Sequence, residues 1–147
     1  MTTEAEPAFV DTNVPVYASR MKSPFHPRAT ASLQRASDDG APIWISRQII
    51  REYLAVVTRP QPTEPALSIA EASAAVERFL ADLNVAEDGP DVTRTLLQCL
   101  AQFPSGGRQV HDVNIVSTML AHDITRLLTF NEADFRRFES VIDIAVP

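Results

Sequence analysis

The feature that most constrains the fold is an alternation of short apolar runs with longer stretches in which apolar residues recur at helical spacing. The short runs are bounded by turn residues and predict strands at residues 8–10, 42–45, 84–86, 126–129 and 141–146. Strands separated by helices require crossover connections, which favour a mainly parallel sheet covered by helices on both faces. The predicted fold class is therefore α/β.

Capping and breaking residues limit the predicted helices. Asn13 is a candidate cap for a helix that runs to about Met21, with Pro15 tolerated in its first turn. Ser46 and Ser68 are the predicted caps of two further helices, and the second of these opens a capping box. The predicted helices cover residues 13–21, 27–40, 46–59, 68–83, 90–103, a stretch that starts at 112, and 131–138.

Length and composition favour one domain over residues 1–147. Apolar residues make up 45% of the chain and charged residues 22%, which is close to the average of globular proteins. The sequence contains no internal repeat, and the proline-rich segment at 60–65 is too short for a domain linker. We expect a single folded unit.

Charge and cysteine content exclude several classes of protein. Nineteen acidic residues against 13 Lys and Arg give a net charge of −6, which argues against binding to bulk duplex DNA or an anionic membrane. The single Cys99 cannot form an intramolecular disulfide or a cysteine-based metal site. The segment MTTEAEPAF is acidic and unlike a secretory signal, and no apolar run approaches a membrane span. We expect a cytoplasmic protein without a membrane partner.

Four acidic residues are predicted to meet at one edge of the sheet. Asp11 ends the first strand, Glu52 lies in the helix after the second, Asp112 starts a helix, and Asp134 follows the fourth strand by one turn. Ligands of open parallel sheets bind beyond the carboxyl ends of the strands, so this edge is where a site is expected. Glu52 falls at the border of the apolar arc of its helix, toward that edge.

Each acid also has a structural interpretation. Asp11 is a possible cap, Asp112 and Asp134 suit the first turns of their helices, and Asn131-x-x-Asp134 resembles a capping box. Together, however, clustered carboxylates repel one another unless some are protonated or a cation lies among them. A set of oxygen ligands without cysteine suits Mg²⁺, with Mn²⁺ as a substitute, better than zinc.

Four segments in the same order carry a family resemblance. They are Phe9-Val10-Asp11-Thr12-Asn13-Val14, Ile45 to Tyr53, His111-Asp112, and Leu128 to Phe135. Over residues 8–145 the chain resembles the PIN domain, in particular the VapC-type toxins of toxin–antitoxin pairs. The resemblance implies an α/β/α sandwich with a mainly parallel central sheet and a Mg²⁺-dependent endoribonuclease. It also implies a homodimer that a cognate antitoxin protein holds inactive.

Carried over position by position, the resemblance assigns a role to each candidate residue. Asp11 and Asp112 would be the principal metal ligands, and Glu52 and Asp134 would complete the catalytic set. Thr12, Asn13 and Asn131 would support the pocket by hydrogen bonding. The chain departs from the family pattern at Pro15, at His122-Asp123 where a glycine often ends the helix, and at Asn131, where a second aspartate is usual.

The expected chemistry is hydrolysis of an RNA phosphodiester. A Mg²⁺ ion between Asp11 and Asp112 would neutralise the phosphate and activate water, leaving a 5′-phosphate and a 3′-hydroxyl. An acidic pocket would also accept an arginine from a partner protein. Two alternatives stay open: a non-catalytic PIN-like domain that binds RNA or protein, and a DNA nuclease of related fold. The dinucleotide-binding, P-loop and serine-hydrolase motifs are absent from the sequence.

Overall fold

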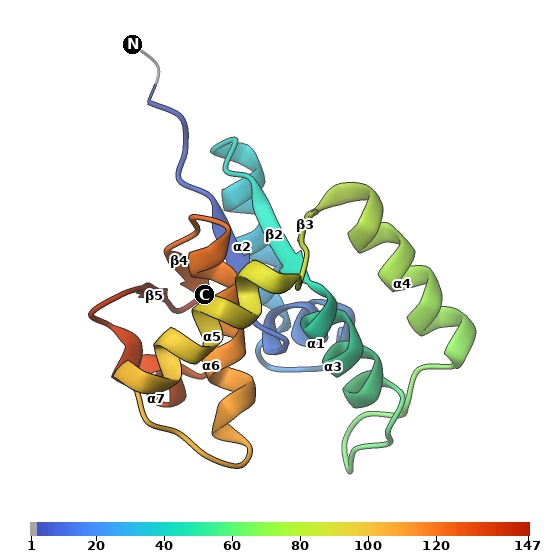
Figure 1. Ribbon diagram of the computed structural model, residues 1–147. Coiled ribbons are helices and arrows are strands. Elements are labelled where there is room, and N and C mark those ends of the chain that lie inside the picture. Colours follow the sequence, from blue (N-terminus) through green and yellow to red (C-terminus); the bar gives the residue numbers. More distant parts are fainter. Residues whose placement is uncertain (1–2) are drawn as a thin grey trace.

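A computed structural model describes residues 3–147, and its centre is one five-stranded sheet. The strands are β1 (Ala8–Val10), β2 (Ile43–Ser46), β3 (Asn84–Ala86), β4 (Arg126–Leu128) and β5 (Asp143–Ala145). Their order is β3-β2-β1-β4-β5, and every neighbouring pair is parallel (Figure 1). The predicted mainly parallel sheet is therefore confirmed.

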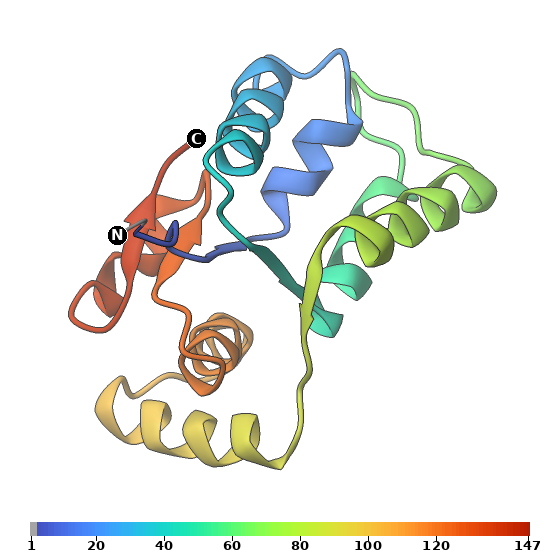
Figure 2. The same cartoon turned by 90° about the horizontal axis from the view of Figure 1, so that it is seen from above.

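Seven α-helices and one 3₁₀ turn connect the strands within residues 3–147. They are α1 (Asn13–Ser19), α2 (His26–Asp38), α3 (Arg47–Val57), α4 (Ile69–Asp82), α5 (Pro90–Gln102), α6 (Gln109–Ala121), α7 (Glu132–Phe135) and η1 (Arg136–Phe138). The chain steps outward from β1 to β3, then returns to β4 on the other side of β1. Because such crossovers are right-handed, this reversal places the later helices on the opposite face. Figure 2 shows α1, α2 and α4 on one side of the sheet and α5 and α6 on the other.

The core lies on both faces of the central strands. Phe9, Ile45 and Leu127 are fully buried, and α3 and α6 contribute Ile49 and Val116. Burial of one such side chain stabilises the fold by ~1.5–3 kcal/mol. β1 is buried along its whole length, so the residue that follows it is held in a fixed position. No helix within residues 3–147 has the length and apolar character that crossing a membrane requires.

Two caps were predicted correctly and one was not. The Ser46 and Ser68 hydroxyls accept hydrogen bonds from the backbone N–H groups of Ile49 and Glu71. The prediction that Asn13 caps α1 was wrong, because Thr12 is the cap residue and makes no side-chain capping bond. Asn13 is the first residue of the helix, and its amide turns toward β4 instead.

Helix limits and faces also differ from expectation in places. α6 begins at Gln109 rather than Asp112, after Gly107 with its positive φ of 60°, although Asp112 stays in the first turn. Helical spacing on α4 predicts that Ile69 and Leu80 share its inner face with Phe79, but both are exposed. The buried residues of this helix are Ala72 and Ala75, and Val76 and Phe79 pack beside them against the core.

Two departures from the family pattern have a local explanation. Pro15 is the third residue of α1, a position whose N–H has no partner inside the helix, so its missing donor costs nothing. Asp123, in the place of the usual glycine, adopts a left-handed φ of 56° just after α6. Aspartate tolerates this conformation better than most residues, which explains how the helix ends without glycine.

Candidate active site

The site forms where the strand order changes direction. β1 and β4 are neighbours, but the chain leaves them toward opposite edges of the sheet, which creates a crevice beyond their carboxyl ends. Asp11 follows β1 and Thr129 follows β4. The Asp11 N–H donates to the Leu128 carbonyl at 3.0 Å, so the two strand ends are joined at this crevice.

Asp11 is a buried carboxylate surrounded by donors. Its exposed fraction is 6%. Oδ2 accepts from the Thr129 hydroxyl at 2.7 Å and from Asn13 Nδ2 at 3.2 Å, and Oδ1 accepts from the Thr12 N–H at 2.8 Å. Burial raises the pKa of Asp11 to about 6, against the lowering effect of the Thr129 and Thr12 bonds; the charges of Glu52 and Asp112 raise it further. The fold thus holds a carboxylate where its charge is unfavourable.

Asn13 connects the end of β1 to the turn before α7. Its Nδ2 also donates to the Thr129 hydroxyl at 3.3 Å, and its Oδ1 accepts from the Phe130 N–H at 3.1 Å. The Thr129 hydroxyl accepts in addition from the Asn131 N–H at 2.9 Å. These bonds fix the position of Asp11 relative to both strands, which gives Asn13 a supporting place in the pocket.

Glu52 approaches the same crevice from α3. Its Oε2 accepts from the Thr12 hydroxyl at 2.6 Å, and its Oε1 accepts from Gln48 Nε2 at 3.0 Å. The side chain is half-buried and lines the pocket, as its position at the border of the apolar arc predicted. Thr12 therefore joins the residue after β1 to the glutamate of α3.

Gln48 is a polar residue of the site that sequence reasoning missed. It is only 7% exposed. Its Nε2 donates both to Glu52 and, at 3.0 Å, to the His111 carbonyl of α6, and its Oε1 accepts from Asn114 Nδ2 at 2.8 Å. The amide therefore links α3 to the first turn of α6, which carries Asp112. Its spacing of four residues before Glu52 is the signal that could have identified it.

Thr129 was also missed as a site residue. It is fully buried, and its hydroxyl makes hydrogen bonds to three different residues of the network. A buried hydroxyl directly after a central strand could have been singled out, because such a group needs polar partners.

Asp112 and Asp134 come from α6 and α7 and line a common hollow. Burial raises the pKa of Asp112, and the charge of Asp134 is the next largest cause; Glu52 also raises it, while Arg137 and His111 lower it. Asp134 is exposed and accepts from Asn131 Nδ2 at 2.6 Å. No side-chain capping bond is made at α7, so within the described chain Asn131 and Asp134 bond to each other rather than forming a capping box.

The pocket brings together three of the four predicted acids. It has a volume of about 560 Å³. Asp11, Glu52 and Asp112 line it, together with Thr12, Asn13 and Asn131. Asp134 does not line it but faces an adjoining hollow, which it shares with Asp112 and Arg137. Asp112 is thus common to both spaces.

The carboxylate oxygens that line the pocket suit a hard divalent cation. Among residues 3–147, no three His, Cys, Asp or Glu side chains form a group arranged to hold a metal ion. Mg²⁺ does not need such a group, because it is usually bound through one or two carboxylates and keeps several of its waters. Asp11 and Asp112 line one pocket, and the charges of neighbouring carboxylates raise the pKa of both, which a cation among them would relieve. The residues present therefore fit a Mg²⁺ ion.

Comparison with known protein families identifies the domain. The family model described as the PIN domain matches residues 8–141, which is most of the chain. The chain belongs to the PIN domain family. All four acidic residues lie inside the matched range. A comparison with curated proteins finds no significant match.

Solved structures share the fold of this PIN domain. A chain of VapBC2 from Rickettsia felis, crystallised with a DNA fragment from its promoter, is 19% identical with a TM-score of 0.69, covering 95% of this chain and 98% of its own. Mycobacterium tuberculosis VapC20, described as a sarcin–ricin loop cleaving toxin, is 17% identical with a TM-score of 0.66, covering 88% and 94%. VapBC-1 from Haemophilus influenzae is 18% identical with a TM-score of 0.66, covering 95% and 96%. At these identities the likeness shows a common fold.

Proposed function

We propose that this PIN domain is a Mg²⁺-dependent endoribonuclease and the toxin of a toxin–antitoxin pair. The observation that carries the proposal is the convergence of Asp11, Glu52 and Asp112 on one pocket from β1, α3 and α6. Besides burial, the charges of Glu52 and Asp112 raise the pKa of Asp11, and those of Asp134 and Glu52 raise the pKa of Asp112. A fold retains such an arrangement at a cost in stability, which is typical of a functional site.

The side chains of the pocket have separate roles in the proposed reaction. When bound between Asp11 and Asp112, Mg²⁺ would supply neutralisation of the phosphate and activation of water. The hydroxyls of Thr12 and Thr129 hold Glu52 and Asp11 in position, so that neither carboxylate has to reorganise. Glu52, with one oxygen bonded to Thr12 and the other to Gln48, is placed to orient the attacking water and to accept its proton.

RNA is the proposed substrate. The similarity to VapC20, which is described as cleaving the sarcin–ricin loop, favours an RNA loop or single strand. The overall charge of −6 disfavours long duplex DNA, while Arg20 and Arg59 line the pocket beside the carboxylates. The proposal therefore assigns phosphate contacts to local arginines rather than to a basic face.

The test is cleavage of end-labelled single-stranded RNA by protein free of contaminating nucleases. We expect cleavage with Mg²⁺ or Mn²⁺, none in excess EDTA, and products that carry a 5′-phosphate and a 3′-hydroxyl. Attack by the ribose 2′-hydroxyl would instead leave a 2′,3′-cyclic phosphate. Undiminished cleavage in EDTA, or cyclic phosphate ends, would contradict the proposed chemistry.

The toxin assignment also proposes protein partners. Several structural neighbours are toxin–antitoxin complexes, among them VapBC2 and a complex from Klebsiella pneumoniae. An acidic pocket is a suitable site for an arginine of an antitoxin, which would displace the ion. We expect the product of the adjacent reading frame to stop RNA cleavage when it forms a stable complex. Full cleavage by that complex would contradict the blocked pocket while leaving the nuclease intact.

The assembly proposed for the free toxin is a homodimer. It rests on the family resemblance and is tested by light scattering over a concentration series. A monomer that persists at high concentration would contradict it.

A further inference from the structure

The pocket extends well beyond the carboxylates. From Asp11 and Glu52 it continues between α1 and α3 along a wall of different chemistry. That wall consists of an aromatic ring, apolar side chains and two guanidinium groups: Val16, Tyr17, Arg20, Ala55, Val56 and Arg59. Binding a metal ion uses only the acidic end, so most of the 560 Å³ is left for the substrate.

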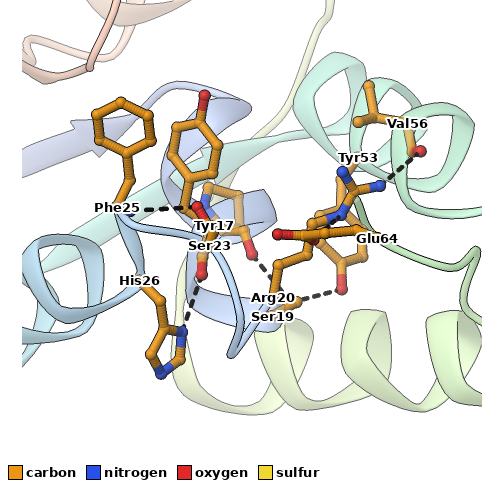
Figure 3. Close-up of polar contacts among 10 residues, drawn as sticks. Tyr17, Ser19, Arg20, Ser23, Phe25, His26, Tyr53, Val56 and Glu64 are labelled. Carbon is orange, nitrogen blue, oxygen red and sulfur yellow. Dashed lines mark hydrogen bonds and ion pairs between the residues drawn. The ribbon is translucent and has the colours of Figure 1, made fainter. Parts of the chain in front are cut away.

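Tyr17 forms the aromatic part of this wall and is fixed by other rings. Its ring lies 4.9 Å from that of Phe25, tilted by 33°, and 5.1 Å from that of Phe130 in an edge-on contact at 86°. His26 Nδ1 donates to the Tyr17 carbonyl at 2.9 Å, which holds the backbone behind the ring (Figure 3). Within residues 3–147 the phenol hydroxyl makes no hydrogen bond, and the side chain stays half-exposed. Tyr17 is therefore an ordered, accessible aromatic group beside the acidic end.

Arg20 and Arg59 differ in how far their charge is already neutralised. Arg20 is 11% exposed; its Nε pairs with Glu64 at 3.1 Å and its Nη2 donates to the Val56 carbonyl at 3.2 Å (Figure 3). Arg59 is exposed, and its Nε donates to the Ala55 carbonyl at 3.0 Å. Among the described residues Arg59 has no carboxylate partner, so its charge is the one available to an anion.

We propose that this wall is a binding subsite for the ribonucleotide next to the cleaved phosphodiester, whose base stacks on Tyr17 and whose phosphate meets Arg59. The subsite rests on the proposed function, because it places a substrate strand across the acidic end. Its ligand class is single-stranded RNA with an unstacked base. Every base presents a flat face to an aromatic ring, so the subsite favours unpaired nucleotides over helical ones without selecting one base.

The first test measures stacking by combining a substitution of Tyr17 in the protein with removal of a base from the RNA. Once the cleavage position in a single-stranded RNA is mapped, the bases on either side are removed in turn, leaving the backbone intact. We expect one abasic position to lower kcat/KM about tenfold with the unmodified protein. Tyr17→Leu should lower kcat/KM about tenfold on the intact RNA and show no further loss on the abasic RNA. Tyr17→Phe keeps the ring and should keep the abasic penalty.

An independent readout separates failure of the subsite from failure of the nuclease assignment. Oligonucleotides with the fluorescent base 2-aminopurine at the same position are bound to the Asp11→Asn protein. This substitution removes a negative charge that repels the RNA and is expected to prevent its cleavage. Stacking on Tyr17 should quench the fluorescence, and the additional Tyr17→Leu change should abolish that quenching. Cleavage with an unchanged abasic penalty in Tyr17→Leu would overturn the subsite alone. Quenching without cleavage by the unmodified protein would overturn the nuclease and support the subsite.

The second test addresses the phosphate contact. Arg59→Gln should weaken RNA binding three- to tenfold and reduce its dependence on salt, whatever the base. Arg51→Gln is the matched control, because Arg51 is an exposed arginine of α3, the helix that Arg59 follows, and does not line the pocket. Equal effects of the two substitutions would show that only general positive charge is involved, and would overturn the assigned contact.

Discussion

Asp11 and Asp134 are both predicted acidic site residues, yet the fold holds them in opposite ways. Asp11 is buried at the carboxyl end of β1 and accepts hydrogen bonds from Thr12, Asn13 and Thr129. Asp134 is exposed on the short helix α7 and accepts one side-chain bond, from Asn131 of the same turn. Asp112, from the first turn of α6, interacts with both.

The difference teaches which parts of the site are fixed by the core. The end of a central strand cannot move without disturbing the sheet, so Asp11 is held in place although burial raises its pKa to about 6. A residue on an exposed single turn is free to change rotamer at little cost. We infer that Asp11 determines the position of the reaction, whereas Asp134 adjusts to what binds.

Of the changes outside Asp11 itself, the largest effect is expected at Asp112, where the two regions meet. Asp112→Asn removes a carboxylate that lines both the pocket and the hollow of Asp134. We expect kcat/KM for RNA to fall about 1,000-fold, because a lost metal ligand costs several kcal/mol of transition-state stabilisation. Steady-state cleavage with saturating Mg²⁺ measures it. A loss below tenfold would mean that Asp112 is not shared in this way.

The next effect concerns the link between α3 and α6. Gln48→Leu removes the amide that donates to Glu52 and to the His111 carbonyl. We expect kcat to fall about 10- to 100-fold with KM little changed, because groups that orient the residues of a metal site contribute at this level. Gln102→Leu, on the exposed end of α5, is the control. A rise in KM with unchanged kcat would contradict a positioning role for Gln48.

Asp134→Asn should have a much smaller effect than either. The side-chain oxygen of asparagine still accepts from Asn131, and the residue is exposed, so we expect kcat/KM to fall less than about tenfold. The same cleavage assay checks it. If Asp134→Asn were as damaging as Asp112→Asn, the contrast between a fixed and an adjustable carboxylate would be wrong.

The smallest effect is on stability and is favourable. The pKa of Asp11 is about 6 in the folded chain against 3.8 ordinarily, so its contribution to stability is present below pH 3.8 and is lost as pH rises through 6. Asparagine at this position cannot ionise, so Asp11→Asn avoids this loss of stability. Its side-chain NH₂ would, however, face one of the groups that now donate to the Asp11 carboxylate. For metal-free protein at pH 7 we expect a gain of ~1 kcal/mol, or ~2–4 °C in Tm, which vanishes toward pH 4. Thermal unfolding in EDTA across this pH range measures it, and a large loss of Tm at pH 7 would assign Asp11 a structural role.

The sequence was most informative where a pattern follows from the main chain. The strand positions, the parallel arrangement and the convergence of Asp11, Glu52 and Asp112 depend on crossover topology, which the alternation of strands and helices determines. Asp134 was placed by the same rule. One turn of helix after β4 was enough to carry it past the pocket into the next hollow.

What the sequence did not reveal depends on side-chain direction. Asn13 was expected to cap α1, but an asparagine at a helix start can equally bond across to a neighbouring strand, and here β4 offers Thr129 and the Phe130 N–H. Gln48 looked like one polar residue in an amphipathic helix. Its importance depends on contact with α6, more than sixty residues away in the chain.

The central claim is that a buried carboxylate, held at the end of β1, directs metal-dependent cleavage of RNA. The measurement that tests it most directly is the rate of single-stranded RNA cleavage by Asp11→Asn over a Mg²⁺ series, beside the unmodified chain and an Asp39→Asn control on an exposed turn. The account predicts a Mg²⁺-dependent rate for the unmodified and control proteins, and background cleavage by the folded Asp11→Asn protein at every concentration. Cleavage by Asp11→Asn at the unmodified rate would contradict it.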